Sequence, residues 1–327
     1  MPNKSKAAYE EVASKVRIRD DPNLLDSDRR YVASFDTALK EGRFVIEGHG
    51  TPLECFLKRG NSDTLHVILG GAHWNSSTPY PSFPRWNFYK MVHGNFLCID
   101  DPTFKLYPKL KVGWFYGNGV SDCRKAVAEA IADVATNLEV DMKNVTIYSY
   151  LINTTASIKI GSYLEGCKVV AVNPALDIRV SKNMKSFNET TGIDALAEDP
   201  LSRNCVYDAL DSGATFLLAC NVRSSSDYES QIIPVFEKYS KNPAYGLNKL
   251  SDNVYVWLYD APSASAKQTA HDSADSYELF PMIDYVARCI GTEYEPMMYE
   301  FVADVANPAW FEYYMKKRKI SELQASP

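Results

Sequence analysis

The sequence predicts an α/β protein in which helices cover both faces of a mostly parallel sheet, giving a three-layer α/β/α arrangement. Two observations predict this fold class. Short, continuous apolar runs recur along the 327-residue chain, and such runs are typical of strands that are buried on both faces. Amphipathic segments of helical length separate these runs, which is the alternation expected of a parallel sheet with crossover helices.

The elements follow one another in the order that this fold class requires. Residues 43–47 and 53–58 flank a Gly-His-Gly-Thr-Pro turn and predict an opening hairpin. Further strands are expected at 65–69, 96–99, 145–150, 169–172, 215–221 and 254–259. Helices are expected at 121–139, 155–164, 228–240, 275–290 and 307–322.

The helix at 121–139 has the clearest pattern. Val127, Ile131 and Val134 fall on one face at helical spacing. Ser121 or Asp122 can cap the first turn, because a short polar side chain accepts hydrogen bonds from backbone N–H groups there. We therefore expect this helix to pack its apolar face on the sheet.

The polarity of the segments predicts the domain organisation. Residues 1–41 are polar and are interpreted as an N-terminal extension, and residues 42–327 as a single domain. Segment 177–213 is polar and irregular, and we interpret it as an insertion. Segment 294–314 is dense in aromatic residues and methionine. It either packs back on the domain or forms the face of a homo-oligomer.

Charge and cysteine content exclude several function classes. The formal net charge is −6, and Lys and Arg are scattered except at 316–319, which we interpret as a solvated helix end. A nucleic-acid partner is therefore not expected. The seven cysteines contain no Cys-x-x-Cys pair, which predicts reduced thiols and no zinc site. We expect a cytoplasmic protein without a membrane span, because no signal peptide and no 18-residue apolar stretch is present.

Two further patterns bear on cofactors. The glycine-rich run at 113–119 does not follow a strand in the way that a nucleotide-binding loop does. Asp100, Asp101 and Asp122 could hold a divalent cation, but aspartates in loops more often form turns. No metal and no cofactor is expected.

Three strings carry a resemblance to a known family. They are PSFPRW at 81–86, NFLCIDDPT at 95–103 and GWFYG at 113–117. With the opening hairpin, they resemble the α/β-hydrolase plan. Within it, they resemble the hydrolase-like proteins found with bacterial surface (capsular) polysaccharide biosynthesis. The resemblance covers about residues 65–290 and implies a glycan esterase or O-acyltransferase role.

The resemblance places a nucleophile on a tight strand-to-helix elbow, flanked by glycines, after the strand VTIYSY. Without gaps, the glycine positions fall on Ser149 and Asn153, and the vacant nucleophile position falls on Leu151. Leucine has no nucleophilic atom, and the β-branched Ile152 disfavours the strained turn. Ser149 or Thr154 could replace the nucleophile if the register shifts. Otherwise the elbow is degenerate.

The resemblance also implies an acid and a histidine. Asp227 lies beyond the strand at 215–221 and matches the acid loop in position, although it could also cap a helix. His271 lies beyond the strand at 254–259 and is the only histidine after Asp227. The order nucleophile, acid, histidine is therefore kept. An exposed loop histidine is the alternative.

The strand at 65–69 leads to the segment where an oxyanion hole is expected. Backbone N–H groups of Gly71 and Ala72 could stabilise an oxyanion, and an ordinary strand-end turn is the alternative. Four neighbouring side chains are candidates for substrate contact: His73, Trp74, Arg85 and Trp86. Aromatic faces stack on the C–H faces of sugar rings, although tryptophans are more often simply core residues.

Two functions from different classes follow from these residues. The first is a catalytically degenerate hydrolase-like protein that supports surface-polysaccharide biosynthesis by binding a glycan or a glycosyltransferase. The alternative is an active glycan esterase or O-acyltransferase with a non-standard nucleophile, in which His271 is the base and Asp227 orients it. A purely oligomerising module, formed through the aromatic C-terminal segment, is a third interpretation.

Overall fold

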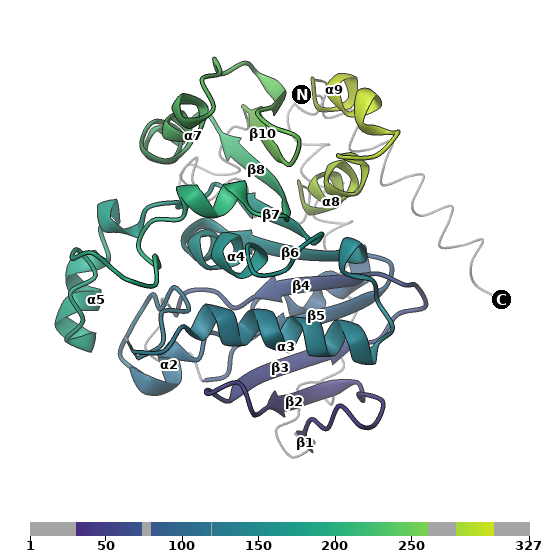
Figure 1. Ribbon diagram of the computed structural model, residues 1–327, viewed down its shortest axis with the longest axis vertical. Helices are drawn as coiled ribbons and strands as arrows, with labels where there is room; N and C mark the ends of the chain where they lie inside the picture. The colour runs from purple at the N-terminus through teal and green to yellow at the C-terminus, as the bar shows by residue number, and fades with distance from the viewer. Residues whose placement is uncertain (1–30, 74–79, 119, 261–278, 304–327) are drawn as a thin grey trace, which may run out of the picture.

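The computed structural model describes residues 31–73, 80–118, 120–260 and 279–303. In these residues, one 10-stranded sheet has the order β1-β2-β3-β5-β4-β6-β7-β8-β10-β9 (Figure 1). The strands are β1 (Tyr31–Val32), β2 (Gly42–Ile46), β3 (Leu53–Lys58), β4 (Leu65–Leu69), β5 (Asn95–Ile99), β6 (Val145–Tyr150), β7 (Lys168–Val172), β8 (Thr215–Asn221), β9 (Gly246–Lys249) and β10 (Val254–Tyr259). β3 is antiparallel to β2 and β5, β9 is antiparallel to β10, and the other neighbouring pairs are parallel. The expected opening hairpin and the mostly parallel sheet are therefore confirmed.

Helices connect the strands of this sheet. In the described ranges they are α2 (Thr103–Leu106), α3 (Cys123–Asn137), α4 (Thr154–Gly161), α5 (Met184–Thr191), α6 (Ser225–Asp227), α7 (Ile233–Lys238), α8 (Leu279–Cys289) and α9 (Glu295–Ala303). Asp122 caps α3 as expected, because its side chain accepts from the backbone N–H groups of Arg124 and Lys125. The helix predicted at 307–322 lies outside the described residues.

The sheet buries both of its faces. Successive strand residues point to opposite faces, and Val67 belongs to an apolar cluster with Val127 and Ile131 of α3. Its neighbour Ile68 belongs to a second cluster with Ile283 of α8. Figure 1 shows α3 and α4 in front of the central strands. Helices therefore cover both faces and complete the three layers.

A third apolar cluster joins the insertion to the loop that follows α2. Trp114 and Tyr116 of this loop each lie with their ring centroids 5.1 Å from that of Phe187, in α5. Ile178 and Met184 of the insertion belong to the same cluster. α2 follows β5 and α5 follows β7, and both lie at one end of the sheet (Figure 1), where the parallel strands end.

Two short strands have no counterpart among the sequence expectations. β1 lies within the segment 1–41 and pairs with β2, and β9 pairs with β10. Both are edge strands with no long apolar run, so the pattern used to recognise buried strands does not reveal them. Among the helices of the described ranges, none has the length and apolar content of a membrane-crossing segment.

Candidate functional site

The turn after β6 has the geometry of an elbow but carries leucine at its tip. Tyr150 ends the strand in extended backbone, and Leu151 then adopts a φ of 56°. A left-handed φ costs a residue with a side chain about 1–2 kcal/mol, so surrounding contacts must hold the turn. The β-branched Ile152 was expected to disfavour this conformation, yet the chain makes the turn at Leu151.

Hydroxyl groups fasten the elbow to its surroundings. Ser149 Oγ and Ser157 Oγ share a short hydrogen bond between β6 and α4. Thr154 Oγ1 donates to Leu151 O at 2.5 Å and accepts from Ala175 N at 2.7 Å. All three side chains are buried. Both hydroxyls considered as replacement nucleophiles, those of Ser149 and Thr154, are thus engaged in bonds that maintain the turn.

The predicted acid lies at the carboxyl end of β8. Asp227 ends α6 and is 7% exposed, and its Oδ2 accepts a hydrogen bond from Ser224 Oγ at 2.5 Å. Its side chain makes no helix-cap hydrogen bond, so the alternative of a helix cap does not account for it. His271 lies outside the described residues, and the Asp227–His271 pair stays a prediction.

Buried polar side chains fill the space between the elbow and the acid loop. Asn173, which follows β7 with a φ of 45°, accepts at Oδ1 from Asn221 N at 2.9 Å and from the Tyr259 hydroxyl at 3.5 Å. Burial, with smaller contributions from Cys220 and Asp227, holds the pKa of Tyr259 well above its usual range. Tyr259 is therefore a neutral hydrogen-bond donor in this layer.

The segment expected to form the oxyanion hole packs against an apolar cluster that the elbow also contacts. Ala72 and Ile152 both pack against the cluster that contains Phe104. A Cβ atom at Gly71 would lie 3.2 Å from Pro84 Cγ, so the backbone runs close to the loop at 81–86. Ala72 and Ile152 thus share one apolar cluster, and the role of Gly71 and Ala72 in an oxyanion hole stays a prediction.

His73 is held as a neutral ring beside a carboxyl group. Its ring stacks on Phe104, with centroids 3.9 Å apart, and burial lowers its pKa. Nε2 lies 4.0 Å from Asp100 Oδ2, which is beyond hydrogen-bond distance, and makes no hydrogen bond with any described residue. His73 is thus a buried side chain packed on Phe104. Trp74 lies outside the described residues.

The two remaining candidates for substrate contact differ in their surroundings. The Arg85 guanidinium lies 4.4 Å from the ring centroid of Tyr150, directly beside the elbow. Trp86 begins the 3₁₀ helix η3 (Trp86–Met91) and packs edge-on against Phe56, with ring centroids 5.6 Å apart. Arg85 thus lies beside Tyr150, and Trp86 packs against the apolar cluster that Leu151 also contacts.

The two aspartates of the string at 95–103 are buried connectors. Asp101 accepts from the backbone N–H groups of Thr103 at 2.9 Å and Phe115 at 2.7 Å. Asp100 accepts from Ser82 N at 2.6 Å. Burial raises the pKa of both carboxyl groups. In the described part of the chain, no group of three or more His, Cys, Asp or Glu residues has the arrangement of a metal site.

Sequence reasoning missed a buried arginine clamp that fixes the loop at 113–117. Trp114 and Phe115 both have positive φ angles, 52° and 51°. Arg124 donates from Nε and Nη2 to Trp114 O at 3.2 and 3.0 Å, and from Nη1 to Arg203 O at 2.9 Å. Arg203 donates in turn to Tyr116 O at 3.1 Å. The clamp therefore ties the strained loop to the insertion.

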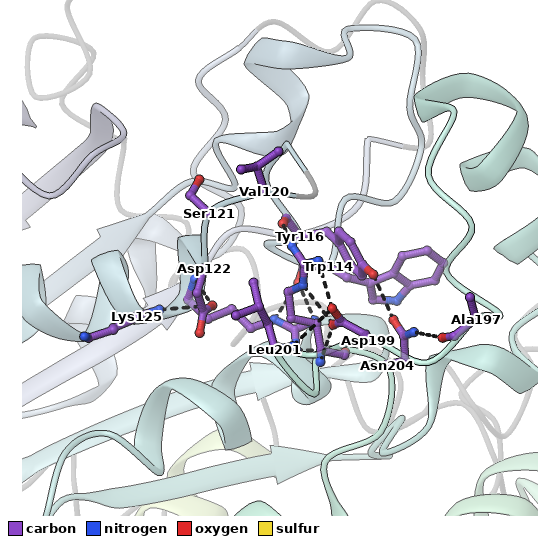
Figure 2. Close-up of polar contacts among 12 residues, drawn as sticks. Trp114, Tyr116, Val120, Ser121, Asp122, Lys125, Ala197, Asp199, Leu201 and Asn204 are labelled. Carbon is purple, nitrogen blue, oxygen red and sulfur yellow. Dashed lines mark hydrogen bonds and ion pairs between the residues drawn. The ribbon is translucent and has the colours of Figure 1, made fainter.

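The outer side of the clamp is fixed by an acid and an amide of the insertion. Asp199 forms an ion pair with Arg203, at 2.9 Å from Nε. The Tyr116 hydroxyl donates to Asn204 Oδ1 at 3.1 Å, and Asn204 Nδ2 donates to Ala197 O (Figure 2). These contacts could not be predicted from the sequence, because the insertion at 177–213 is simply polar and Arg124 is one charged residue within a helical pattern.

No protein-family model and no curated protein matches the chain. Among solved structures, the 2,6-dihydroxy-pseudo-oxynicotine hydrolase is similar with a TM-score of 0.53 and 12% identity, over 77% of this chain and 69% of that one. Together with the strand order and the elbow, this likeness decides the fold. The chain has an α/β-hydrolase-like fold.

Two further solved structures are similar to the chain. A glycosylation-associated protein (Gap123) complex from Streptococcus agalactiae is similar with a TM-score of 0.50 and 15% identity, over 76% of this chain. The chain spans 46% of that protein, about half of its length. The capsule O-acetyltransferase of Neisseria meningitidis serogroup A has a TM-score of 0.48 and 9% identity, over 66% of this chain and 86% of that one. At these identities, the likeness concerns the fold alone.

The α/β-hydrolase-like fold assigns a place to each part of the candidate site. The elbow backbone at Leu151, the acid position at Asp227 and the oxyanion segment at Ala72 all lie at the carboxyl ends of the parallel strands. Acyl transfer also needs a nucleophilic atom at the tip of the elbow, and leucine supplies none. The described residues therefore provide a hydrolase-like frame with leucine at the tip of its elbow.

Proposed function

We propose that this chain is a degenerate α/β-hydrolase-like protein that supports surface-polysaccharide biosynthesis by binding a glycan or a glycosyltransferase. The observation that carries the proposal is Leu151, whose φ of 56° places an aliphatic side chain at the tip of the elbow. Leu151 thus adopts the strained backbone of a nucleophile elbow, although leucine cannot attack an ester.

The hydrogen bonds of the elbow support the first half of the proposal. A serine nucleophile must point its hydroxyl into the site and lose its proton to a base. The Ser149 hydroxyl instead meets Ser157, and the Thr154 hydroxyl bridges Leu151 O and Ala175 N. Turning either hydroxyl toward substrate would break bonds that stabilise the elbow.

Sequence strings and a similar solved structure support the proposed role in surface-polysaccharide biosynthesis. The strings at 81–86, 95–103 and 113–117 resemble those of hydrolase-like proteins found with surface-polysaccharide biosynthesis. The Gap123 complex that shares the fold is named for an association with glycosylation. This chain spans only about half of that protein. A partner shared with it is therefore part of the proposal.

Labelling with a serine-directed fluorophosphonate, read by intact mass, tests the first half. We expect no adduct on the wild-type chain and none on Ser149→Ala. Leu151→Ser restores a hydroxyl at the tip of the elbow and is the positive control for access of the probe. One wild-type adduct that maps to Ser149 or Thr154, and that His271→Ala abolishes, would overturn the proposal in favour of an active esterase or O-acyltransferase.

Titration with a panel of capsular and cell-wall saccharides tests the second half. We expect at least one of them to bind saturably, with Arg85→Gln weakening the affinity because Arg85 lies beside the elbow. Arg179→Gln, in the insertion, is the matched control. Absence of saturable binding to every saccharide, and to glycosyltransferases from the same source, would refute this half while leaving the labelling result intact.

The active enzyme is the second candidate function, and the burial of Asp227 favours it. A carboxylate that is 7% exposed beyond β8 matches the position where an acid orients the catalytic histidine. Hydrolysis of p-nitrophenyl acetate well above background, lost in both Asp227→Asn and His271→Ala, would establish this function. Equal rates for the wild type and these variants would exclude it.

A further inference from the structure

A pocket of about 370 Å³ opens at the end of the sheet opposite the elbow. One wall is the loop after β3, which includes Arg59 and Gly60, and the other is the segment from Tyr89 to Gly94 that leads into β5. β3 runs antiparallel to β5, so the last residue of β3 lies at the amino end of the parallel strands. Leu151 follows the carboxyl end of β6, which places the pocket far from the candidate site.

Two glycines approach each other closely in the lining of the pocket. A Cβ atom at Gly60 would lie 2.1 Å from Gly94 O, and one at Gly94 would lie 2.0 Å from Thr64 Oγ1. The Asn95 side chain accepts from Gly60 N at 3.3 Å and donates to the carbonyl groups of Ser62 and Thr64 at 3.2 Å each. A preformed site loses little conformational entropy when a ligand binds.

Two cationic side chains, those of Lys58 and Arg59, line the pocket, and Lys58 is paired with Glu41. Arg59 is exposed, and its guanidinium makes no ion pair or hydrogen bond with any described residue. The two acids nearby are already engaged: Glu41 binds Lys58 Nζ at 2.7 Å, and Asp63 accepts from Asn144 Nδ2 at 3.1 Å. The planar guanidinium is suited to binding a carboxylate or phosphate with two parallel hydrogen bonds.

The lining also includes an aromatic and an aliphatic side chain. Tyr89 and Val92 line the pocket on the side of η3, opposite Arg59. An aromatic side chain next to polar groups is the combination that receives the C–H face of a sugar ring. We propose that this pocket binds an anionic sugar unit, with the ring on Tyr89 and its carboxylate or phosphate on Arg59. The site is separate from the elbow and does not depend on the function proposed there.

NMR titration of the full chain tests the proposal with four probes: glucuronate, glucose 1-phosphate, neutral glucose and inorganic phosphate. At least one of the two anionic sugars is expected to bind, and which of them binds identifies the anion. Glucose and phosphate, which each lack one half of the recognised unit, are expected to bind at least about tenfold more weakly. Glucose or phosphate binding as tightly as the anionic sugar would overturn the proposal.

Two variants locate the binding in this pocket. Arg59→Gln is expected to weaken binding of the anionic sugar about tenfold by removing a charge-assisted hydrogen-bond pair, and Tyr89→Leu is expected to weaken it without changing the response to phosphate. Arg179→Gln removes an exposed arginine of the insertion and is the matched control. Equal affinities for Arg59→Gln, Arg179→Gln and the wild type would overturn the proposal. Circular dichroism confirms that each variant is folded.

Discussion

Replacing Arg124 by methionine is expected to destabilise the protein by about 3 kcal/mol. Arg124 is 0% exposed, and its three hydrogen bonds end on only two carbonyl groups, those of Trp114 and Arg203. In the described part of the chain, no carboxylate lies within ion-pair distance of this guanidinium. The loss is therefore one of hydrogen bonds to the backbone.

The magnitude follows from the two carbonyl groups that methionine leaves without a donor. Each buried, unsatisfied group costs about 1–3 kcal/mol, so the pair costs about 2–6 kcal/mol. Part of this is offset, because burial lowers the pKa of Arg124 to about 10 and so disfavours its charged form. The net effect lies in the lower half of that range. Arg124→Lys keeps a charge but loses the planar fork, and we expect most of the same loss.

Urea unfolding followed by circular dichroism measures this difference as a change in the free energy of unfolding. Lys125→Met is the matched control, since Lys125 is the next residue, its side chain is 63% exposed, and its replacement is expected to change stability by less than about 0.5 kcal/mol. Proteolysis of the insertion is expected to be faster in Arg124→Met than in the control. Equal stability of Arg124→Met and Lys125→Met would refute the reasoning, because the carbonyl groups would then have found other donors.

Three further predictions concern buried groups. Gly113→Ala is expected to cost about 2 kcal/mol or more, since its Cβ would lie 2.4 Å from Asp101 Oδ2; an unchanged melting temperature would contradict this. Burial raises the pKa of Asp100, so its contribution to stability is present below the ordinary pKa of 3.8 and is lost as the pH rises through the folded-state pKa. Urea unfolding across this window should show the wild type gaining stability on acidification relative to Asp100→Asn, and parallel pH curves would argue against it. Tyr148→Phe removes the hydroxyl that donates to the buried Asp284 and should cost about 1–3 kcal/mol, whereas calorimetry that shows no loss would exclude this contact as a stabilising one.

Local signals in the sequence were sufficient for most of the fold. Apolar runs located β4 to β8 and β10, and the spacing of Val127, Ile131 and Val134 located α3, which Asp122 caps as expected. These signals act over a few residues, since each side chain reports the face on which its own element is buried. The resemblance, aligned without gaps, placed Leu151 at the tip of the elbow.

The conformation at the elbow depended on contacts that the sequence does not display. Ile152 argued against a strained turn, yet Leu151 adopts it. The Thr154 hydroxyl holds the turn by bonding both Leu151 O and Ala175 N. Ala175 lies beyond the next strand, so its part in the elbow could not be read from the residues around Leu151.

The sequence by itself determined the fold class and the order of the buried strands, because hydrophobic periodicity is a local property, and its resemblance to hydrolase-like proteins put leucine at the nucleophile position. Only the tertiary structure decided that Asp101 and Arg124 act as buried connectors of the loop at 113–117. It also decided that Arg203, 79 residues from Arg124, completes the clamp. Such partners are chosen by the packing of distant segments, since a buried polar group must find a partner wherever the fold brings one within reach.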